Sequence, residues 1–251
     1  MRTIKHTMVI MMILVLSSSC TQNGPKQMVA KLNEITSFVA VGDCSKAEKK
    51  YQEFISAGYA PDSIMEKSLG DCFMRKEAYD EALKWYLQSA SHGFASAQNS
   101  LGQMYQYGIG VNRDIAEAIK WYHKAADQNN AAALFNLGYI YDFDALEHPN
   151  DGVAQDVEEA MKWYLRSAQL GLKEAQANLA YLYEMKEQYS EAFEWYGKAA
   201  DQGSALAQNQ LGNFYYSGIV VQKDLDKAIE WWEKAARQGY EPAQNNLKQL
   251  K

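Results

Sequence analysis

Apolar and small residues recur at intervals of three and four along most of this chain, which is the spacing of one face of an α-helix. Within residues 97–130, the first such run places Ala97, Leu101 and Tyr105 four residues apart. A turn with two glycines follows, and glycine adopts backbone conformations that other residues resist. A second run then continues to Ala126. The pattern predicts two helices joined by a short loop.

Two further residues define how this unit is built. Asp114 precedes the second helix, and Glu117 follows three residues later. This is an acidic form of the capping box, in which the Asp side chain accepts a hydrogen bond from a backbone N–H of the first turn. Gly102 directly follows Leu101 and leaves room for a neighbouring helix to approach closely. We therefore expect a closely packed helix pair.

The unit recurs along the chain and is marked by pairs of aromatic residues. The pairs are Trp85-Tyr86, Trp121-Tyr122, Trp163-Tyr164, Trp195-Tyr196 and Trp231-Trp232, at spacings of 36, 42, 32 and 36 residues. Small residues follow most pairs, and a Gly, or Asn129 in one copy, can end the helix in a left-handed conformation. A repeat of this length predicts a stacked helical array whose units bury their apolar faces only against their neighbours.

These residues resemble Sel1-like repeats, relatives of tetratricopeptide repeats with a longer loop between the paired helices. The family pattern, roughly A-x-x-x-L-G-x-x-Y-x-x-G-x-G-V-x-x-D-x-x-x-A-x-x-W-Y-x-x-A-A-x-x-G, is matched almost throughout from Ala97 to Gln128. It also fits Ala207 to Gly239, except that Val220 replaces the second loop glycine. The resemblance covers the chain from about Tyr59 onward. It implies an all-α fold, an α/α solenoid superhelix of helix pairs.

We expect four segments in chain order. Residues 1–19 read as a signal peptide of lipoprotein type, and residues 20–25 as a very short tether. Residues 26–58 predict N-terminal helices that include a degenerate repeat. Residues 59–251 form the Sel1-like array, and its last helix has a polar outer face that suits a terminal cap.

The first segment has the composition of an export signal. Arg2 and Lys5 precede an unbroken apolar run from Met8 to Leu16, and three serines lead to Cys20. Nine apolar residues are too few to span a bilayer, which takes about 20 residues, so the run predicts the core of a signal peptide. A cysteine after small residues resembles a bacterial lipobox, although Ser17 stands where Leu is usual.

The lipobox resemblance implies that Cys20 is lipidated and becomes the new N-terminus. A lipid anchor holds a protein on a membrane surface without spanning the bilayer. We therefore expect an exported lipoprotein of the bacterial envelope, on the periplasmic or outer-membrane face. The alternative is an ordinary cleaved signal with an incidental cysteine, which would give a soluble periplasmic or secreted protein.

Charge argues against nucleic acid as a partner. The chain has a formal net charge of −6, and removal of Arg2 and Lys5 with the signal leaves 23 basic against 31 acidic residues, a net charge of −8. Because phosphate binding depends on clustered basic residues, the overall electrostatic contribution would be repulsive.

Two cysteines remain beyond the signal region. Cys44 precedes the helix expected to end near Gly58, and Cys72 lies near the end of the next helix. If those helices are antiparallel, both cysteines lie at the same end of the pair. An exported chain meets an oxidising compartment, so we expect a disulfide between them. The alternative is two free buried thiols.

Two copies depart from the family pattern. The segment Asp142 to Gly152 carries six extra residues and is rich in Asp and Glu. It lacks the ligand spacing of an EF-hand, so we expect a solvated acidic loop and no metal. The segment Tyr183 to Ser190 has lost four residues and the glycine loop, which makes that copy tetratricopeptide-like.

Catalysis has little support in the sequence, and we expect neither enzymatic activity nor a cofactor. The histidines His6, His92, His123 and His148 stand alone, and His6 is discarded with the signal. The serine acylase, lipase, zinc-protease and P-loop motifs are absent. Some cysteine-rich Sel1-like proteins have been described as β-lactamase-like, but those carry a paired cysteine in each repeat.

The surface expected to bind a partner is the concave one, lined by the first helix of each pair. If the helices pack as in tetratricopeptide repeats, a row of amides and tyrosines, with one carboxylate, lies on this concave surface. The candidate groove residues are Asn99, Gln103, Gln106, Tyr139, Tyr181, Glu184, Asn209, Asn213 and Tyr216, and Asp142 occupies an equivalent position. Basic residues fall on the second helices instead: Lys120, Lys124, Lys162, Arg166 and Lys234. Amides and hydroxyls suit extended peptide backbone or sugar hydroxyls.

The sequence thus favours a non-catalytic scaffold or adaptor of the cell envelope that binds a protein or peptide partner, with the membrane reached only through the lipid. Two alternatives remain open. One is a cell-wall or β-lactam-active enzyme, and the other is a peptidoglycan- or glycan-binding module.

Overall fold

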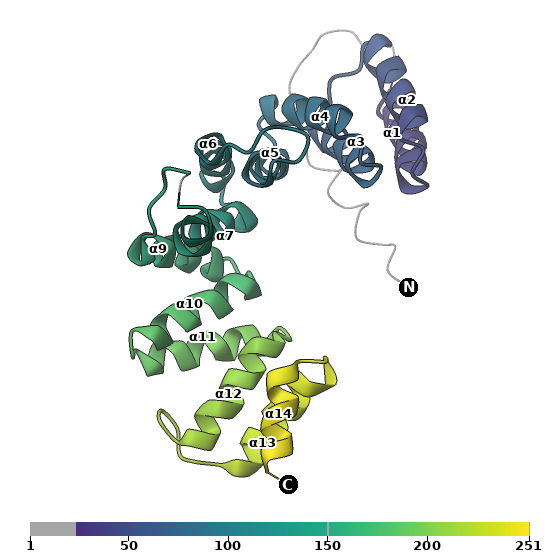
Figure 1. Ribbon diagram of the computed structural model, residues 1–251. Helices are drawn as coiled ribbons and strands as arrows, with labels where there is room; N and C mark the ends of the chain where they lie inside the picture. Colours follow the sequence, from purple (N-terminus) through teal and green to yellow (C-terminus); the bar gives the residue numbers. More distant parts are fainter. Residues whose placement is uncertain (1–23, 150, 251) are drawn as a thin grey trace.

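The computed structural model describes residues 24–149 and 151–250, and the regular structure in those ranges is helical (Figure 1). The elements are α1 (Pro25–Ala40), α2 (Cys44–Ser56), α3 (Ser63–Arg75), α4 (Tyr79–Ser91), α5 (Ala95–Tyr107), α6 (Ile115–Ala126), α7 (Ala131–Tyr139), η2 (Ile140–Asp144), α8 (Ala145–Glu147), α9 (Val157–Gln169), α10 (Lys173–Met185), α11 (Tyr189–Asp201), α12 (Ala205–Ser217), α13 (Leu225–Arg237) and α14 (Glu241–Gln249). The predicted signal peptide and Cys20 lie outside the described residues.

The helices stack in pairs, and the predicted all-α solenoid is confirmed. Helix α5 packs on α6, α7 on α9, α10 on α11, and α12 on α13, while the second helix of each pair also contacts the first helix of the next. Figure 1 shows the series bending into an open curve, with α5 and α7 on its inner side and α6 and α9 on its outer side. Buried apolar residues accordingly form successive clusters along the array.

The buried stripes lie where the periodicity predicts them. In α5, Ala97 and Leu101 are 0% exposed, and so are Ala118, Tyr122 and Ala125 in α6. Each pair therefore buries its small and aromatic residues between its two helices.

In four first helices the glycine of the Leu-Gly pair meets the second aromatic residue of its own repeat, while α10 carries Leu179-Ala180 instead. A Cβ atom added to Gly102 would lie 2.5 Å from ring atoms of Tyr122, and one added to Gly212 would lie 2.5 Å from ring atoms of Trp232. Two further contacts of this kind join Gly70 with Tyr86 and Gly138 with Tyr164. The aromatic ring therefore occupies the space that a side chain at the glycine would need.

The helix ends follow the expected capping chemistry. The side chain of Asp114 accepts a hydrogen bond of 2.9 Å from the backbone N–H of Glu117, and Asp156 and Asp224 cap α9 and α13 in the same way. Asn129 adopts a left-handed φ of 58° at the position where other repeats carry glycine. Both the predicted N-cap and the predicted role of Asn129 are confirmed.

In three repeats an equivalent backbone hydrogen bond closes the loop between the paired helices, although the loops differ in length. The N–H of the capping Asp donates to the carbonyl of the Tyr that lies four residues after the repeat leucine, at 2.9 Å each time. The three bonds are Asp114 to Tyr105, Asp156 to Tyr141 and Asp224 to Tyr215. The six extra residues of the acidic insert are therefore accommodated inside an otherwise standard loop.

The prediction that the acidic insert is a solvated loop is wrong for its first residue. Helix α7 continues into the π-helix η2, and Asp142 is only 4% exposed because this continued helix keeps it in the interior. Arg113 of the preceding loop donates from Nη2 to Asp151 at 2.6 Å, which fixes the far end of the insert. Glu147 and His148, at the tip, are exposed as expected.

A disulfide joins Cys44, at the start of α2, to Cys72 in α3, with 5.6 Å between their Cα atoms. Both residues are buried, at 5% and 0% exposure. This is the pair that the sequence analysis singles out, and the bond ties the N-terminal helices to the first repeat.

Glutamines connect successive repeats at the helix ends. The side-chain amides of Gln98, Gln176 and Gln208 each donate to the backbone carbonyl eight residues earlier, at 3.1–3.4 Å. Each glutamine also accepts a hydrogen bond from another glutamine side chain further along, which lies at the end of the next second helix. These pairs are Gln128 with Gln98, Gln202 with Gln176 and Gln238 with Gln208. A recurring polar bridge thus accompanies the apolar stack.

The first prediction tests the aromatic–glycine contact. Gly102→Ala should lower the free energy of unfolding by about 1–3 kcal/mol, because the new methyl group collides with the Tyr122 ring in a packed interior. Gly197→Ala in α11 is the matched control, since no atom lies within 4 Å of its added Cβ, and it should raise stability by about 0.5–1 kcal/mol through helix propensity. Urea denaturation followed by circular dichroism measures both, and equal effects would contradict the packing argument.

Candidate partner-binding groove

The first helices α5, α7, α10 and α12 carry the residues predicted to line the concave groove, and α5 and α7 lie on the inner side of the curve (Figure 1). These first helices present few charges. Helices α5, α7 and α12 contain no charged residue, and α10 contains Lys173, Glu174 and Glu184. The basic residues predicted for the second helices do lie on α6, α9 and α13. The groove is therefore lined mainly by neutral polar and aromatic side chains.

The fifth residue after each repeat leucine contacts the second aromatic residue of its own repeat. In two repeats the contact is a hydrogen bond donated by the Tyr hydroxyl, to Gln106 at 2.7 Å and to Glu184 at 2.8 Å. The four contacts are Gln106 with Tyr122, Asp142 with Tyr164, Glu184 with Tyr196 and Tyr216 with Trp232. Part of the predicted binding row therefore serves to hold each helix pair together.

Two of the nine predicted groove residues are buried, and the prediction that they face a partner is wrong. Gln106 is 0% exposed because the Tyr122 hydroxyl lies against its side chain. Asn209 is 5% exposed because Asn246 of α14 donates a 3.0 Å hydrogen bond to its side-chain oxygen. Asp142, which occupies an equivalent position, is buried in the same manner.

Other amides of the first helices bind adjoining helices. The side chain of Asn136 donates to Asn99 at 2.9 Å, and that of Asn178 donates to the Tyr164 hydroxyl at 3.2 Å. Asn213 accepts a 3.1 Å hydrogen bond from the Trp232 indole. These side chains therefore carry structural contacts even where they are half exposed.

The remaining groove residues are those with accessible side chains. Gln103 is exposed, Tyr181 and Tyr216 are 43% and 46% exposed, and Tyr139 is half buried with its ring 5.5 Å from that of Phe143. These residues leave side-chain surface for a partner.

Sequence reasoning missed Met185, which is 65% exposed in α10. Met185 lies four residues after Tyr181, so helical spacing alone places the two on one face. Tyr107, at the equivalent position of α5, is also exposed, at 54%. We call Tyr181, Glu184, Met185 and Tyr216 the α10–α12 surface.

Asp142 is a buried titratable group in the repeat that carries the acidic insert. One of its carboxylate oxygens, Oδ2, is buried without a hydrogen-bond partner. Burial raises the pKa of this carboxyl group from 3.8 to about 6, and hydrogen bonding with Tyr164 opposes part of the shift. The described side chains include no group of three or more His, Cys, Asp or Glu that could hold a metal ion. Ionisation of this buried carboxyl group therefore lowers the stability of the fold.

A second buried carboxylate lies in the first repeat and corrects the expectation that the histidines stand alone. Glu66 is 0% exposed, and its oxygens lie 2.7 Å from His92 Nδ1 and 2.7 Å from Gln88 Nε2. Tyr51 donates to the same carboxylate at 3.1 Å. The contacts join α2, α3 and α4, so His92 has a structural partner.

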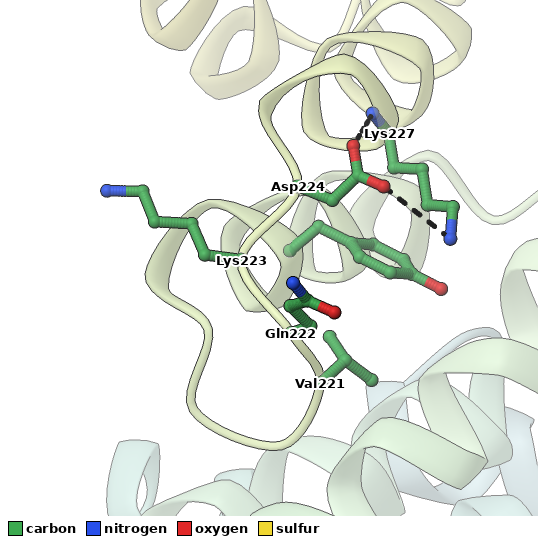
Figure 2. A pocket seen from close by; sticks show the side chains of 6 residues that line it. Val221, Gln222, Lys223, Asp224 and Lys227 are labelled. Atoms are coloured by element: carbon green, nitrogen blue, oxygen red, sulfur yellow. Dashed lines mark hydrogen bonds and ion pairs between the residues drawn. The ribbon is translucent and has the colours of Figure 1, made fainter.

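A shallow cavity of about 310 Å³ lies beside the loop that joins α12 and α13 (Figure 2). Asp224 and Lys227 line it, and they bind each other: the Lys227 backbone N–H donates to Asp224 at 3.0 Å, and its ammonium lies 3.6 Å from the same carboxylate. Figure 2 shows Lys223 extending away from these two residues. The cavity therefore lacks a set of converging side chains for catalysis.

Comparisons with known proteins agree with the observed architecture. The model of the Sel1 repeat matches residues 95–130, 131–172, 173–204 and 205–240, and a tetratricopeptide repeat model matches residues 32–103. Neither is the model of a catalytic family. No curated protein matches the chain. Each helix of the described residues is too short or too polar to cross a bilayer.

Solved structures include similar proteins. A Sel1 repeat protein from Oxalobacter formigenes is 31% identical, with a TM-score of 0.69 over 87% of this chain and 89% of its own. A protective antigen present in uropathogenic Escherichia coli strains, displaying an SLR fold, is also 31% identical, with a TM-score of 0.75. This chain covers 48% of that antigen. PilF from Pseudomonas aeruginosa, at 16% identity and a TM-score of 0.61, shares the fold.

The second prediction concerns the pH dependence of stability. The pKa of Asp142 is raised to about 6 in the folded chain, so its ionisation costs stability as pH rises from about 4 to 6 and the cost is complete above that range. Asp142→Asn should therefore gain about 1–3 kcal/mol relative to wild type between pH 4.5 and pH 7.5. Urea unfolding at each pH measures this difference. Asp201→Asn, at the exposed end of α11, is the control, and an equal pH slope in both variants would contradict the assignment.

Proposed function

The chain belongs to the Sel1 repeat family, and from that premise we propose that it is a non-catalytic adaptor of the bacterial envelope that binds an extended segment of a partner protein. The Sel1 and tetratricopeptide-like fold is a scaffold typical of protein–protein interaction. Beyond this general role, we propose which surface binds the partner, that the bound segment is extended, and that the protein lies in the bacterial envelope.

One observation carries the choice of surface: two neighbouring first helices, α10 and α12, expose large aromatic and apolar side chains. Tyr181, Met185 and Tyr216 are each more than 40% exposed, and α10 and α12, which carry them, are in contact through Gln210 and Glu184. Tyrosine and methionine provide large contact areas, and tyrosine loses little conformational entropy on binding. An extended peptide would meet these side chains together with half-exposed amides.

The groove does not favour a carboxylate-gripping mode. Within α5, α7, α10 and α12 the only basic residue is Lys173, at the first position of α10. Recognition of a terminal carboxylate by clustered Lys or Arg side chains would need several such groups. We therefore propose binding along the backbone and side chains of an internal segment.

The proposed location rests on the N-terminal sequence. Cys20 follows three serines, and α1 begins at Pro25, five residues later. A lipid on Cys20 would hold the array close to a membrane surface, where a partner would belong to the same envelope compartment.

The third prediction tests the groove in cells. A full-length tagged chain with Gln103, Tyr181, Met185 and Tyr216 changed to Ala should lose a protein that wild type captures by in-cell crosslinking and mass spectrometry. The loss should exceed about 10-fold, because several exposed contact residues are removed together. Circular dichroism checks that the variant is folded.

The control changes Lys120 and Lys162 to Ala on α6 and α9, where these side chains are 67% and 70% exposed. The control should keep the captured protein. Loss in the control alone would assign binding to the outer face, and co-sedimentation of both variants with purified sacculi would favour a glycan ligand.

The fourth prediction tests the anchor. Cys20→Ala should abolish incorporation of a labelled fatty acid and move the chain from the membrane fraction to the soluble fraction, because a lipid chain supplies the membrane affinity. Cys72→Ala is the control for a general effect of cysteine loss and should keep the label. Unchanged labelling of Cys20→Ala would contradict the proposed lipoprotein.

A further inference from the structure

One carboxylate of the concave groove has hydrogen-bond donors but no cation. Glu184 Oε2 accepts hydrogen bonds from the Tyr196 hydroxyl at 2.8 Å and from Gln210 Nε2 at 3.0 Å. Both donors are neutral, so neither supplies a positive charge. Lys186, two residues further on, forms its ion pair with Glu158 of α9 instead. Among the described residues, no Lys, Arg or His pairs with Glu184.

Glu184 is also held in a defined position. The hydrogen bond from Tyr196 fixes it against α11, and the bond from Gln210 fixes it against α12. Both bonds go to the same oxygen, and the other oxygen, Oε1, makes no hydrogen bond within the described part of the chain. A carboxylate oriented by two neighbouring helices can offer this second oxygen to a ligand without further ordering.

Aromatic and apolar surface surrounds the carboxylate. Tyr181 lies three residues before Glu184 on the same helix and is 43% exposed, while Met185 is 65% exposed. On α12, the ring of Tyr216 already has the Lys223 ammonium 5.2 Å from its centre, so this part of the surface attracts a cation from its own chain. The side chains of Lys and Arg combine an apolar stem with a cationic head, which suits a carboxylate bordered by Tyr and Met.

We propose that the α10–α12 surface recognises a Lys or Arg side chain of the partner segment, with Glu184 as its ion-pair partner and Tyr181 and Met185 along its stem. The inference rests on the proposed function, because it names the chemistry of the segment bound in the groove. Since α5, α7 and α12 carry no charged residue, an ion pair at Glu184 also sets where the basic side chain of the peptide lies along the groove.

Selection from a phage-displayed library of random 12-residue peptides on the immobilised full-length protein tests the proposal. Three proteins are compared: wild type, Glu184→Gln and Glu174→Gln. Gln keeps an oxygen that accepts from Tyr196 and Gln210, so the fold is preserved while the charge is lost. Glu174 is an exposed carboxylate in the first turn of the same helix and serves as the matched control.

Peptides selected on wild type and on Glu174→Gln should be enriched in Lys or Arg, and those selected on Glu184→Gln should not. A selected basic peptide should bind Glu184→Gln about 10-fold more weakly than wild type in a fluorescence titration. Peptides enriched without a basic residue, or equal binding by Glu184→Gln, would overturn the inference and leave the groove function standing. No enrichment above the unselected library on any of the three proteins would overturn the proposed peptide-binding function as well.

Discussion

The close contact between a glycine of the first helix and an aromatic ring of the second helix sets the geometry of four helix pairs in this array, and α10 carries Ala180 at the same position. The ring of Tyr122 or Trp232 lies where a glycine side chain would begin, so it fixes how closely the two helices approach. A ring buried this deeply brings a hydroxyl or an indole N–H into the interior, and that group requires a hydrogen-bond partner. Gln106, Glu184 and Asn213 meet that need. The same contact that makes the helix pairs compact therefore also decides which polar side chains of the groove remain available.

This dependence explains how far the sequence predicts the structure. The repeat pattern predicts the helix pairs, the buried stripes and the caps because each depends on residues close together in one repeat. The groove is harder to predict, since mapping outward positions on one helix ignores what the next helix places opposite them. Gln106 lies on the outward side of α5 by helical geometry, yet the Tyr122 hydroxyl from α6 buries it. Asn209 is buried by α14, one repeat later in the chain.

The acidic insert also shows that local composition alone does not predict which residues are buried. Its aspartates and glutamate indicate a solvated loop, and its tip is exposed. Asp142 nevertheless continues the helical turn of α7 into η2 and keeps the position, opposite Tyr164, that Gln106 and Glu184 hold in their own repeats. The loop then closes with the Asp156 to Tyr141 backbone bond found in the standard repeats. Position within the repeat therefore outweighs local polarity at Asp142, and the raised pKa of its carboxyl group is the physical consequence.

The side chains that distinguish this groove from that of a regular repeat array lie where the sequence departs from the repeat pattern. Where the pattern is complete, side chains of the first helices are used to bind the adjoining helices, as with Asn99 and Asn136. In the shortened copy, Met185 is exposed one helical turn after Tyr181. Glu184 in that copy satisfies the buried Tyr196 hydroxyl, as Gln106 does for Tyr122, but brings a negative charge that an amide lacks. Because the array requires only an acceptor at that position, a carboxylate there can accept the Tyr196 hydrogen bond and also present a negative charge to a partner.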